Sequence, residues 1–229
     1  MANEAGKRAA AQAAVGLIES GMTVGLGSGT TSRLFIEALG ARVRAEHLQI
    51  RGVPTSRAAE AQARALGIPV VELTRNTVPD LAIDGADEVD PRLNLIKGGG
   101  GALVQEKLVA VSARDFVVIA DSSKAVAVLG KFPLPVAIIP FGWETTLGRL
   151  EQEFVVPAAR RLRDDQPLVT DDGMYLIDLQ FGRIPDPEEL ENRLERIVGV
   201  IDIGLFIAIP SRVLYGYADG RVEEVRRPA

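Results

Sequence analysis

The sequence predicts an α/β fold, in which a doubly wound, mostly parallel sheet domain carries a smaller inserted α+β domain. Strand-like and helix-like segments alternate through the first half of the chain, as expected when helices connect parallel strands. Residues 116–120 are apolar throughout, which is typical of a strand covered on both faces. The alternation ends near Lys131, and 229 residues are enough for a main domain with a smaller one attached.

Each predicted element of the main sheet has a local signal. The first helix is rich in Ala, has apolar residues at helical spacing, and ends before Gly21. A short strand then leads into a glycine-rich turn, and Pro54 begins a later helix that ends at Gly67. The predicted helices cover residues 4–19, 32–39, 54–67 and 102–113, and the predicted strands cover residues 22–26, 48–53, 68–71, 81–83 and 116–120.

The segments after Lys131 lie further apart and are interrupted by proline. Asp171-Asp-Gly173 is a hairpin signal between two strand-like runs, residues 169–170 and 174–178. Residues 187–196 have the composition of a charged helix.

These patterns predict the limits of the two domains. We expect residues 131–206 to form the smaller α+β domain and residues 1–130 with 207–229 to form the main domain. Residues 212–216 are expected to return to the main sheet.

The composition excludes several kinds of site. The chain has no Cys and a single His, His47, so disulfides, iron–sulfur clusters, thiolate zinc sites and cysteine nucleophiles are absent. A net charge of −5 provides no global basic field for nucleic acid or anionic lipid, so local groups must hold any anionic ligand. We see no signal peptide and no apolar run near the ~18 residues that a membrane span needs, so we expect a cytoplasmic protein.

The segment Gly25-Leu-Gly-Ser-Gly-Thr-Thr31 joins a predicted strand to a predicted helix. Its glycines let a ligand approach the backbone, and free N–H groups at the start of the helix favour a phosphate. The segment lacks the Lys of a Walker A loop and the third Gly of a dinucleotide fingerprint. A monophosphate therefore fits better than a nucleotide, and a plain glycine-rich turn is the alternative.

The segment Asp84-Gly-Ala-Asp87-Glu88 follows an apolar strand, so its carboxylates should lie at the carboxyl edge of the sheet, where ligands of such folds bind. A solvated acidic turn is the alternative from these residues alone. A magnesium site is also possible, but no further cluster of ligands supports it.

The segment from Lys97 to Glu106 gives this acidic turn a chemical context. Lys97 can offset negative charge, and the four glycines that follow allow backbone conformations closed to other residues. Glu106 falls on a helix face of small residues, with Ala102 and Ala110. A carboxylate partly removed from water on such a face suits a general base near neutral pH, whereas a paired surface glutamate is the alternative.

Asp121-Ser-Ser-Lys124 follows the apolar strand at residues 116–120. Lys124 should therefore lie at the same carboxyl edge of the sheet, where it can contact a ligand. An ordinary surface lysine is the alternative explanation.

At these residues the chain resembles the type A family of ribose-5-phosphate isomerases. The matching segments follow the family's order and cover nearly the whole chain. They are Gly25–Thr31, Asp84–Glu88, Lys97–Ala102, Glu106-Lys107, Asp121–Lys124, Leu129-Gly-Lys-Phe-Pro-Leu-Pro135 and Gly204-Leu-Phe206.

The resemblance implies interconversion of D-ribose 5-phosphate and D-ribulose 5-phosphate, a step of the non-oxidative pentose phosphate pathway, without a cofactor. It implies that the main domain is catalytic, that the smaller one is lid-like, and that the chain forms homodimers or homotetramers. By the same resemblance, Glu106 is the base that moves a proton between C1 and C2 through an enediolate. Asp84 and Asp87 help to open the furanose and shuttle hydroxyl protons, and Lys97 offsets charge on the intermediate.

The resemblance also implies a substrate-binding set. Its members are Ser28, Gly29, Thr30 and Thr31 of the sugar-phosphate loop, Asp84, Gly85, Ala86 and Asp87, Lys97, Gly98, Gly99 and Gly100, Lys124, and the N-terminal Lys7. The match at Lys7 is loose. The loop carries Thr30-Thr31 where Ser-Thr is common, which keeps both hydroxyls, and Trp143 has no assigned role.

Two classes of alternative function remain at this point. A sugar-phosphate-sensing domain of a regulator would need a helix-turn-helix and a basic face, and neither is visible. A coenzyme A transferase or an amino-sugar-phosphate deaminase could use a similar scaffold, but the combined Asp84/Asp87 and Lys97/Glu106 pattern argues against both. We also expect no metal requirement, and activity that a chelator abolishes and magnesium restores would contradict this expectation.

Overall fold

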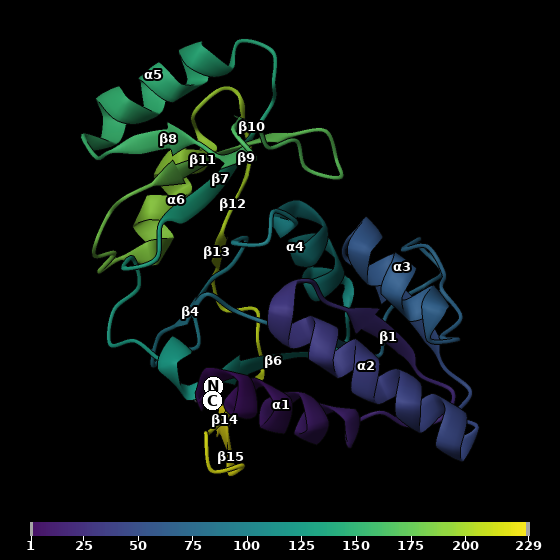
Figure 1. The fold of residues 1–229 in the computed structure, drawn as a ribbon. Coiled ribbons are helices and arrows are strands. Elements are labelled where there is room, and N and C mark those ends of the chain that lie inside the picture. The colour runs from purple at the N-terminus through teal and green to yellow at the C-terminus, as the bar shows by residue number, and fades with distance from the viewer. Residues whose placement is uncertain (1, 228–229) are drawn as a thin grey trace. The chain divides into compact units, whose positions relative to one another are not determined.

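The structure, a computed structural model, describes residues 2–227 (Figure 1). The chain divides into two compact units. The first unit contains Met1–Ala86, Gln105–Lys124 and Ala208–Ala229, and the second contains Asp87–Val104 and Ala125–Ile207.

A six-stranded sheet forms the centre of the first unit. Its strand order is β15-β14-β6-β3-β1-β2. All neighbours pair in parallel except β14 and β15, which are antiparallel. The bounds are β1 Thr23–Leu26, β2 Arg51–Pro54, β3 Leu81–Asp84, β6 Phe116–Asp121, β14 Arg212–Gly216 and β15 Val222–Arg226. The predicted return of residues 212–216 to the main sheet is confirmed.

Helices cover both faces of this sheet. Val24 and Leu26 of β1 pack in one core with α1 (Ala2–Val15) and α2 (Gly29–Glu46), and α3 (Arg57–Ala65) joins the same core. The alternate residue Gly25 faces the other way. A Cβ added there would lie 2.7 Å from Val109 Cγ1 of α4 (Leu103–Ser112). Because successive strand residues point to opposite faces, the sheet is doubly wound, and the predicted fold class is confirmed.

The strand order creates a switch point between β1 and β3. From β1 the chain moves outward to the edge strand β2, then returns past β1 to β3. The connections that leave the carboxyl ends of β1 and β3 therefore separate, and this opens a crevice where ligands of such sheets bind. Gly27–Thr31 follow β1 and Asp84 ends β3, so both predicted segments lie at this point.

The second unit is built on a four-stranded antiparallel sheet, ordered β12-β7-β11-β8. Its strands are β7 Leu134–Ile138, β8 Ala158–Arg160, β11 Tyr175–Leu179 and β12 Val200–Ile203. The helices α5 (Trp143–Phe154) and α6 (Pro187–Glu195) pack on it through a core that includes Leu150 and Leu194. Asp186 caps α6 by accepting a hydrogen bond from Glu189 N at 3.1 Å.

Smaller elements complete the chain. A three-stranded sheet, ordered β13-β5-β4, joins Leu205–Phe206, Leu95–Ile96 and Glu88–Val89. The ribbon of β9 (Leu162–Arg163) and β10 (Gln166–Pro167) belongs to the second unit, and the 3₁₀ helix η1 (Ser122–Lys124) follows β6 in the first. The β4–β5–β13 pairing groups residues 87–104 with the second unit, whereas the sequence pattern assigned them to the main domain.

Four local predictions differ from the structure. The first helix ends at Val15, before its predicted end at residue 19. The second helix runs from Gly29 to Glu46 and is longer than the predicted residues 32–39. The predicted strand at residues 68–71 is only a bridge from Val70 to Gly52, since Pro69 cannot donate to a ladder. Residues 169–170 form no strand, and β11 pairs instead with β7 and β8.

Candidate active site

The glycine-rich loop after β1 leads directly into α2. Ser28 is the N-cap of α2, and Gly29 begins the helix at φ +91°, a conformation that favours glycine. Ser28 is half-buried, Gly29 and Thr30 are exposed, and Thr31 is buried. The loop thus presents the start of an 18-residue helix at the carboxyl edge of the sheet, as a phosphate site requires.

Asp84 is buried at the end of β3, with 3% of its surface exposed. Its Oδ1 accepts hydrogen bonds from Ser28 N at 3.0 Å, Ser32 Oγ at 2.8 Å and Gly85 N at 2.7 Å. Gly27 makes room for this carboxylate, because an added Cβ would lie 2.6 Å from Asp84 Cβ and closer still to Oδ1. The first predicted acid and the predicted phosphate loop are therefore in direct contact.

Three hydroxyl groups meet beside this loop. Ser28 Oγ lies 2.8 Å from Thr55 Oγ1 and 2.7 Å from Ser56 Oγ, and Thr55 Oγ1 donates to Leu26 O at 3.2 Å. Ser56 also caps α3 by accepting from Ala59 N at 3.1 Å. The sequence pattern did not indicate Thr55, Ser56 or Ser32 as neighbours of the site. A signal was present, since Thr55 and Ser56 directly follow β2, the strand beside β1.

Two lysines of the first unit were predicted at the ligand. Lys7 Nζ donates to Thr30 Oγ1 at 3.0 Å, so the residue with the loosest sequence match lies on the phosphate loop. Lys124 ends η1 directly after β6, which neighbours β3 in the sheet, and its side chain is half-buried. Both lysines therefore belong to the carboxyl-edge region of the first unit.

Glu106 lies in the first turn of α4 and is buried, with 4% of its surface exposed. Val109 and Ala110 share the buried side of this helix, whereas Leu108 and Val111 are more than half exposed on the other. The helix face predicted from its small residues is the buried one. Glu106 is therefore a shielded carboxylate, and the alternative of a surface glutamate is wrong.

Lys97 belongs to the second unit and is buried, with 2% exposure. Its Nζ lies 5.4 Å from the centroid of the Phe206 ring, and its N donates to Gly204 O at 2.9 Å. A Cβ at Gly204 would lie 2.7 Å from Pro135 Cδ and press on the Lys97 carbonyl oxygen. Lys97 thus sits in a fixed position, with its ammonium over an aromatic face.

Asp87 contacts the glycine loop within the second unit. Its Oδ2 accepts a hydrogen bond from Gly99 N at 2.8 Å. A Cβ at Gly99 would lie 2.7 Å from Asp87 Oδ1, and Gly98 has φ +100°. Gly98 is buried, while Gly99 and Gly100 are exposed and Gly85, Ala86 and Asp87 are half-buried. The glycines therefore allow the loop backbone to lie close to the Asp87 carboxylate.

Glu88 differs in role from the two aspartates that precede it. It is 4% exposed, and its carboxylate accepts hydrogen bonds from Gly130 N and Phe132 N, each at 2.7 Å. The side chain ties β4 to the loop before β7, both in the second unit. Glu88 is therefore an anchor of that loop.

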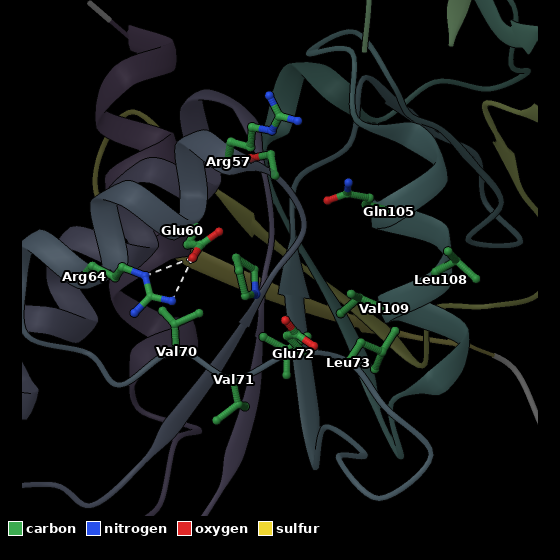
Figure 2. Close-up of a pocket in the computed structure, with 13 residues that line it drawn as sticks. Arg57, Glu60, Arg64, Val70, Val71, Glu72, Leu73, Gln105, Leu108 and Val109 are labelled. Carbon is green, nitrogen blue, oxygen red and sulfur yellow. Dashed lines mark hydrogen bonds and ion pairs between the residues drawn. The ribbon is translucent and has the colours of Figure 1, made fainter. Parts of the chain in front are cut away.

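The cavities of the first unit only partly coincide with the predicted residues. A cavity of about 450 Å³ lies among α3, residues 70–73 and α4, and the Glu60–Arg64 ion pair is on its rim (Figure 2). No predicted site residue lines it. Ser28, Gly29 and Thr30 line another cavity of about 520 Å³, beside Arg33 and Ser56.

Two further properties concern metals and membranes. Among residues 2–227, no group of three or more His, Cys, Asp or Glu side chains could hold a metal ion. No helix in the described part of the chain is long and apolar enough to cross a membrane.

Comparison with known proteins gives one consistent result. The family model of ribose 5-phosphate isomerase A (phosphoriboisomerase A) matches residues 51–220. A ribose-5-phosphate isomerase A of Ruegeria pomeroyi is 48% identical over 95% of this chain and 85% of the relative.

Solved structures agree with this match. Ribose 5-phosphate isomerase A of Methanocaldococcus jannaschii has a TM-score of 0.90 at 42% identity, covering 96% of this chain and 97% of that one. A D-ribose-5-phosphate isomerase in complex with phospho-erythronic acid has a TM-score of 0.94 at 40% identity, covering 99% and 100%. The chain belongs to the ribose 5-phosphate isomerase A family.

Proposed function

We propose that this protein interconverts D-ribose 5-phosphate and D-ribulose 5-phosphate by proton transfer through an enediolate. The observation that carries the proposal is the shielded Glu106, in the first turn of the helix that follows Lys97 and its four glycines. A buried carboxylate in a chain that also carries a phosphate-binding loop suits proton abstraction next to a carbonyl. The complex of a related isomerase with phospho-erythronic acid, a phosphorylated sugar acid, supports a sugar phosphate as the ligand.

The phosphate of the substrate is assigned to the loop after β1. Backbone N–H groups of Gly29, Thr30 and Thr31 lie at the start of α2, where partial positive charge favours an anion. Ser28 is the N-cap of this helix, and its own N–H bonds Asp84. Lys7, whose Nζ bonds Thr30, adds a full positive charge at this loop. Lys124 is assigned as a further contact to the sugar phosphate.

The chemical step begins with the open-chain aldose. Glu106 removes the proton from C2, and the electron pair of that C–H bond forms the C1–C2 double bond while the C1 carbonyl becomes an enediolate oxygen. Glu106 then returns the proton to C1, and the loss of the O2 proton produces the C2 ketone. A positioned general base contributes about 10²- to 10⁴-fold to such a step.

The remaining polar residues are assigned to the oxygen atoms of the substrate. Asp84 and Asp87 are assigned to opening of the furanose and to transfer of the hydroxyl proton between O2 and O1. Lys97 is assigned to the negative charge of the enediolate, because a preorganised cation stabilises charge that develops in the reaction. Gly85, Ala86, Gly98, Gly99 and Gly100 would contact the sugar mainly through their backbone.

Assembly, domains and location follow the family. We propose that the protein works as a homodimer or homotetramer in the cytoplasm, within the pentose phosphate pathway. The catalytic domain is proposed to contain residues 1–130 and 207–229, and residues 131–206 are proposed as the smaller domain. These functional bounds differ from the compact units at residues 87–104, 125–130 and 207, which group with the second unit.

A direct assay tests the activity. The purified chain is supplied with D-ribose 5-phosphate, and formation of D-ribulose 5-phosphate is followed, with D-ribose and another pentose 5-phosphate as comparison substrates. We expect turnover of ribose 5-phosphate and little of the unphosphorylated sugar, since the phosphate loop would be empty. Binding of ribose 5-phosphate without any conversion would contradict the proposal and favour a sugar-phosphate sensor.

A further inference from the structure

Arg161 follows β8 in the second unit, and hydrogen bonds to other segments fix its backbone. Its N donates to Leu176 O at 2.8 Å, and its carbonyl accepts from Leu168 N at 3.0 Å. Its side chain is only 13% exposed. An arginine that is largely withdrawn from water requires partners for its N–H groups, and these partners explain its position.

Asp178 of β11 supplies the first partner. Arg161 Nε donates to Asp178 Oδ2 at 2.8 Å, and Nη2 donates to Asp178 Oδ1. The carboxylate is 21% exposed. Two parallel hydrogen bonds fix the plane of the guanidinium as well as its charge, which a lysine cannot do.

The third nitrogen of the guanidinium, Nη1, contacts the glycine loop, residues 98–101. Arg161 Nη1 donates to Gly98 O at 2.7 Å and to Gly99 O at 3.2 Å. The Gly98 carbonyl and the Gly99 N–H belong to one peptide group. Asp87 binds the N–H end of that peptide at 2.8 Å while Arg161 binds its oxygen end.

This double contact determines which way the peptide points. A reversal of the peptide would turn its oxygen toward the Asp87 carboxylate and its N–H toward the guanidinium, so both contacts would become repulsive. The surrounding glycines provide little restraint of their own, since Gly98 and Gly101 have φ of +100° and +89° and the run is conformationally permissive. A turn hydrogen bond from Gly101 N to Gly98 O, at 3.0 Å, also holds the oxygen of this peptide. The two charged side chains add restraint at both ends of the peptide.

We propose that Arg161, oriented by Asp178, is a positioning residue that sets the Gly98–Gly99 peptide and through it Asp87 and the Lys97 segment for the isomerisation. The inference rests on the proposed function for its effect on catalysis. Arg161 acts through the loop, so it is assigned no contact with the substrate.

The test compares Arg161→Ala, Arg161→Lys and Asp178→Asn with a matched control, Arg193→Ala. Arg193 makes a similar ion pair with Glu153 in the same unit, at 2.7 Å and with 43% exposure, but neither contacts the loop. We expect kcat of Arg161→Ala to fall about 10- to 100-fold, as for a misplaced catalytic group, with KM within about 3-fold. Arg161→Lys and Asp178→Asn should lose less kcat than Arg161→Ala, and Arg193→Ala should retain the wild-type kcat.

Two further measurements separate positioning from general stability. Guanidinium at about 10–50 mM should restore part of the kcat of Arg161→Ala, because it can fill the space between Asp178 and the Gly98 carbonyl, and should not affect Arg193→Ala. Amide hydrogen exchange at Gly99 should be faster in Arg161→Ala than in the wild-type chain or the control. The exchange measurement needs no activity, so it tests the peptide contact even if the isomerase assay fails. Wild-type kcat and unchanged Gly99 exchange in folded Arg161→Lys and Asp178→Asn would overturn the proposal.

Discussion

Asp84 and Asp87 belong to one short segment of the chain, yet the protein holds them in different ways. Asp84 is buried, and its Oδ1 accepts from Ser28 and Ser32 at the start of α2 and from Gly85 directly after β3. Asp87 is half-buried, and the contact that orients it comes from a glycine loop that Arg161 restrains. Regular secondary structure positions the first acid, whereas side chains from distant parts of the sequence position the second.

The largest effect is expected at Glu106, which tests whether the buried carboxylates carry the chemistry. Glu106→Gln keeps the shape of the side chain but removes the base, so kcat should fall about 10²- to 10⁴-fold with KM little changed. Steady-state kinetics on ribose 5-phosphate measure this. The control is Glu60→Gln, at an exposed ion pair of α3, which should retain full kcat. Near-normal turnover by Glu106→Gln would remove that residue from the role of base.

The next largest effect sharpens the contrast between the two aspartates. Gly27→Ala would place a Cβ against the whole Asp84 side chain, which three donors prevent from moving. We expect a loss of about 1–3 kcal/mol in the free energy of unfolding and a clear loss of kcat. Thermal unfolding and steady-state assays measure both.

Gly99→Ala is the matched variant on the other side of the comparison. Its Cβ would meet only the end of the Asp87 side chain, and Asp87 is half-buried and can turn away. We expect a loss of less than about 1 kcal/mol in stability, together with reduced kcat. Equal destabilisation by Gly27→Ala and Gly99→Ala would contradict the distinction between a rigid and an adjustable acid.

A smaller effect is expected at the phosphate loop. Lys7→Ala removes the ammonium that bonds Thr30, so KM for ribose 5-phosphate should rise about 10-fold while kcat changes little. The rise should shrink at high salt, because this contact is exposed and screened. Arg8→Ala, the exposed neighbour paired with Glu4, serves as the control and should leave KM unchanged.

The smallest effect on activity is expected at Glu88. Glu88→Gln weakens the contacts to Gly130 N and Phe132 N, so the free energy of unfolding should fall by about 1–3 kcal/mol. The kcat of the folded enzyme should remain close to that of the wild type, since Glu88 anchors the loop before β7 and is not assigned to the substrate. A loss of kcat comparable to that of an Asp87 variant would show that all three acids act together.

Much of the first unit was predictable from local patterns. The apolar run at residues 116–120, the glycine-rich turn after β1 and the acids after β3 each have a sequence signal, and parallel strands bring their carboxyl ends to one edge. Lengths were less predictable, because α2 extends to Glu46 through packing on α1 and α3 that propensity does not reveal.

The second unit was predicted less well, for a physical reason. Its sheets are antiparallel and join segments far apart in the chain, such as β5 with β13 and β7 with β12. Two-residue strands have no readable period, so the grouping of residues 87–104 with this unit depends on pairing with Leu205–Phe206. No local pattern near Arg161 indicates that its side chain reaches Gly98.

The sequence by itself determined the inventory of groups: two acids, a lysine before four glycines, a glutamate on a small-residue face, and no thiol. Residue type and short spacing suffice for that, because they depend only on neighbouring positions. The tertiary structure decided which groups are held and by what: Asp84 by three donors of the sheet edge, Glu88 by the loop before β7, and the Gly98–Gly99 peptide by Asp87 and Arg161. Hydrogen bonds between residues distant in the chain exist only once the strands have paired, so no local pattern in the sequence specifies them.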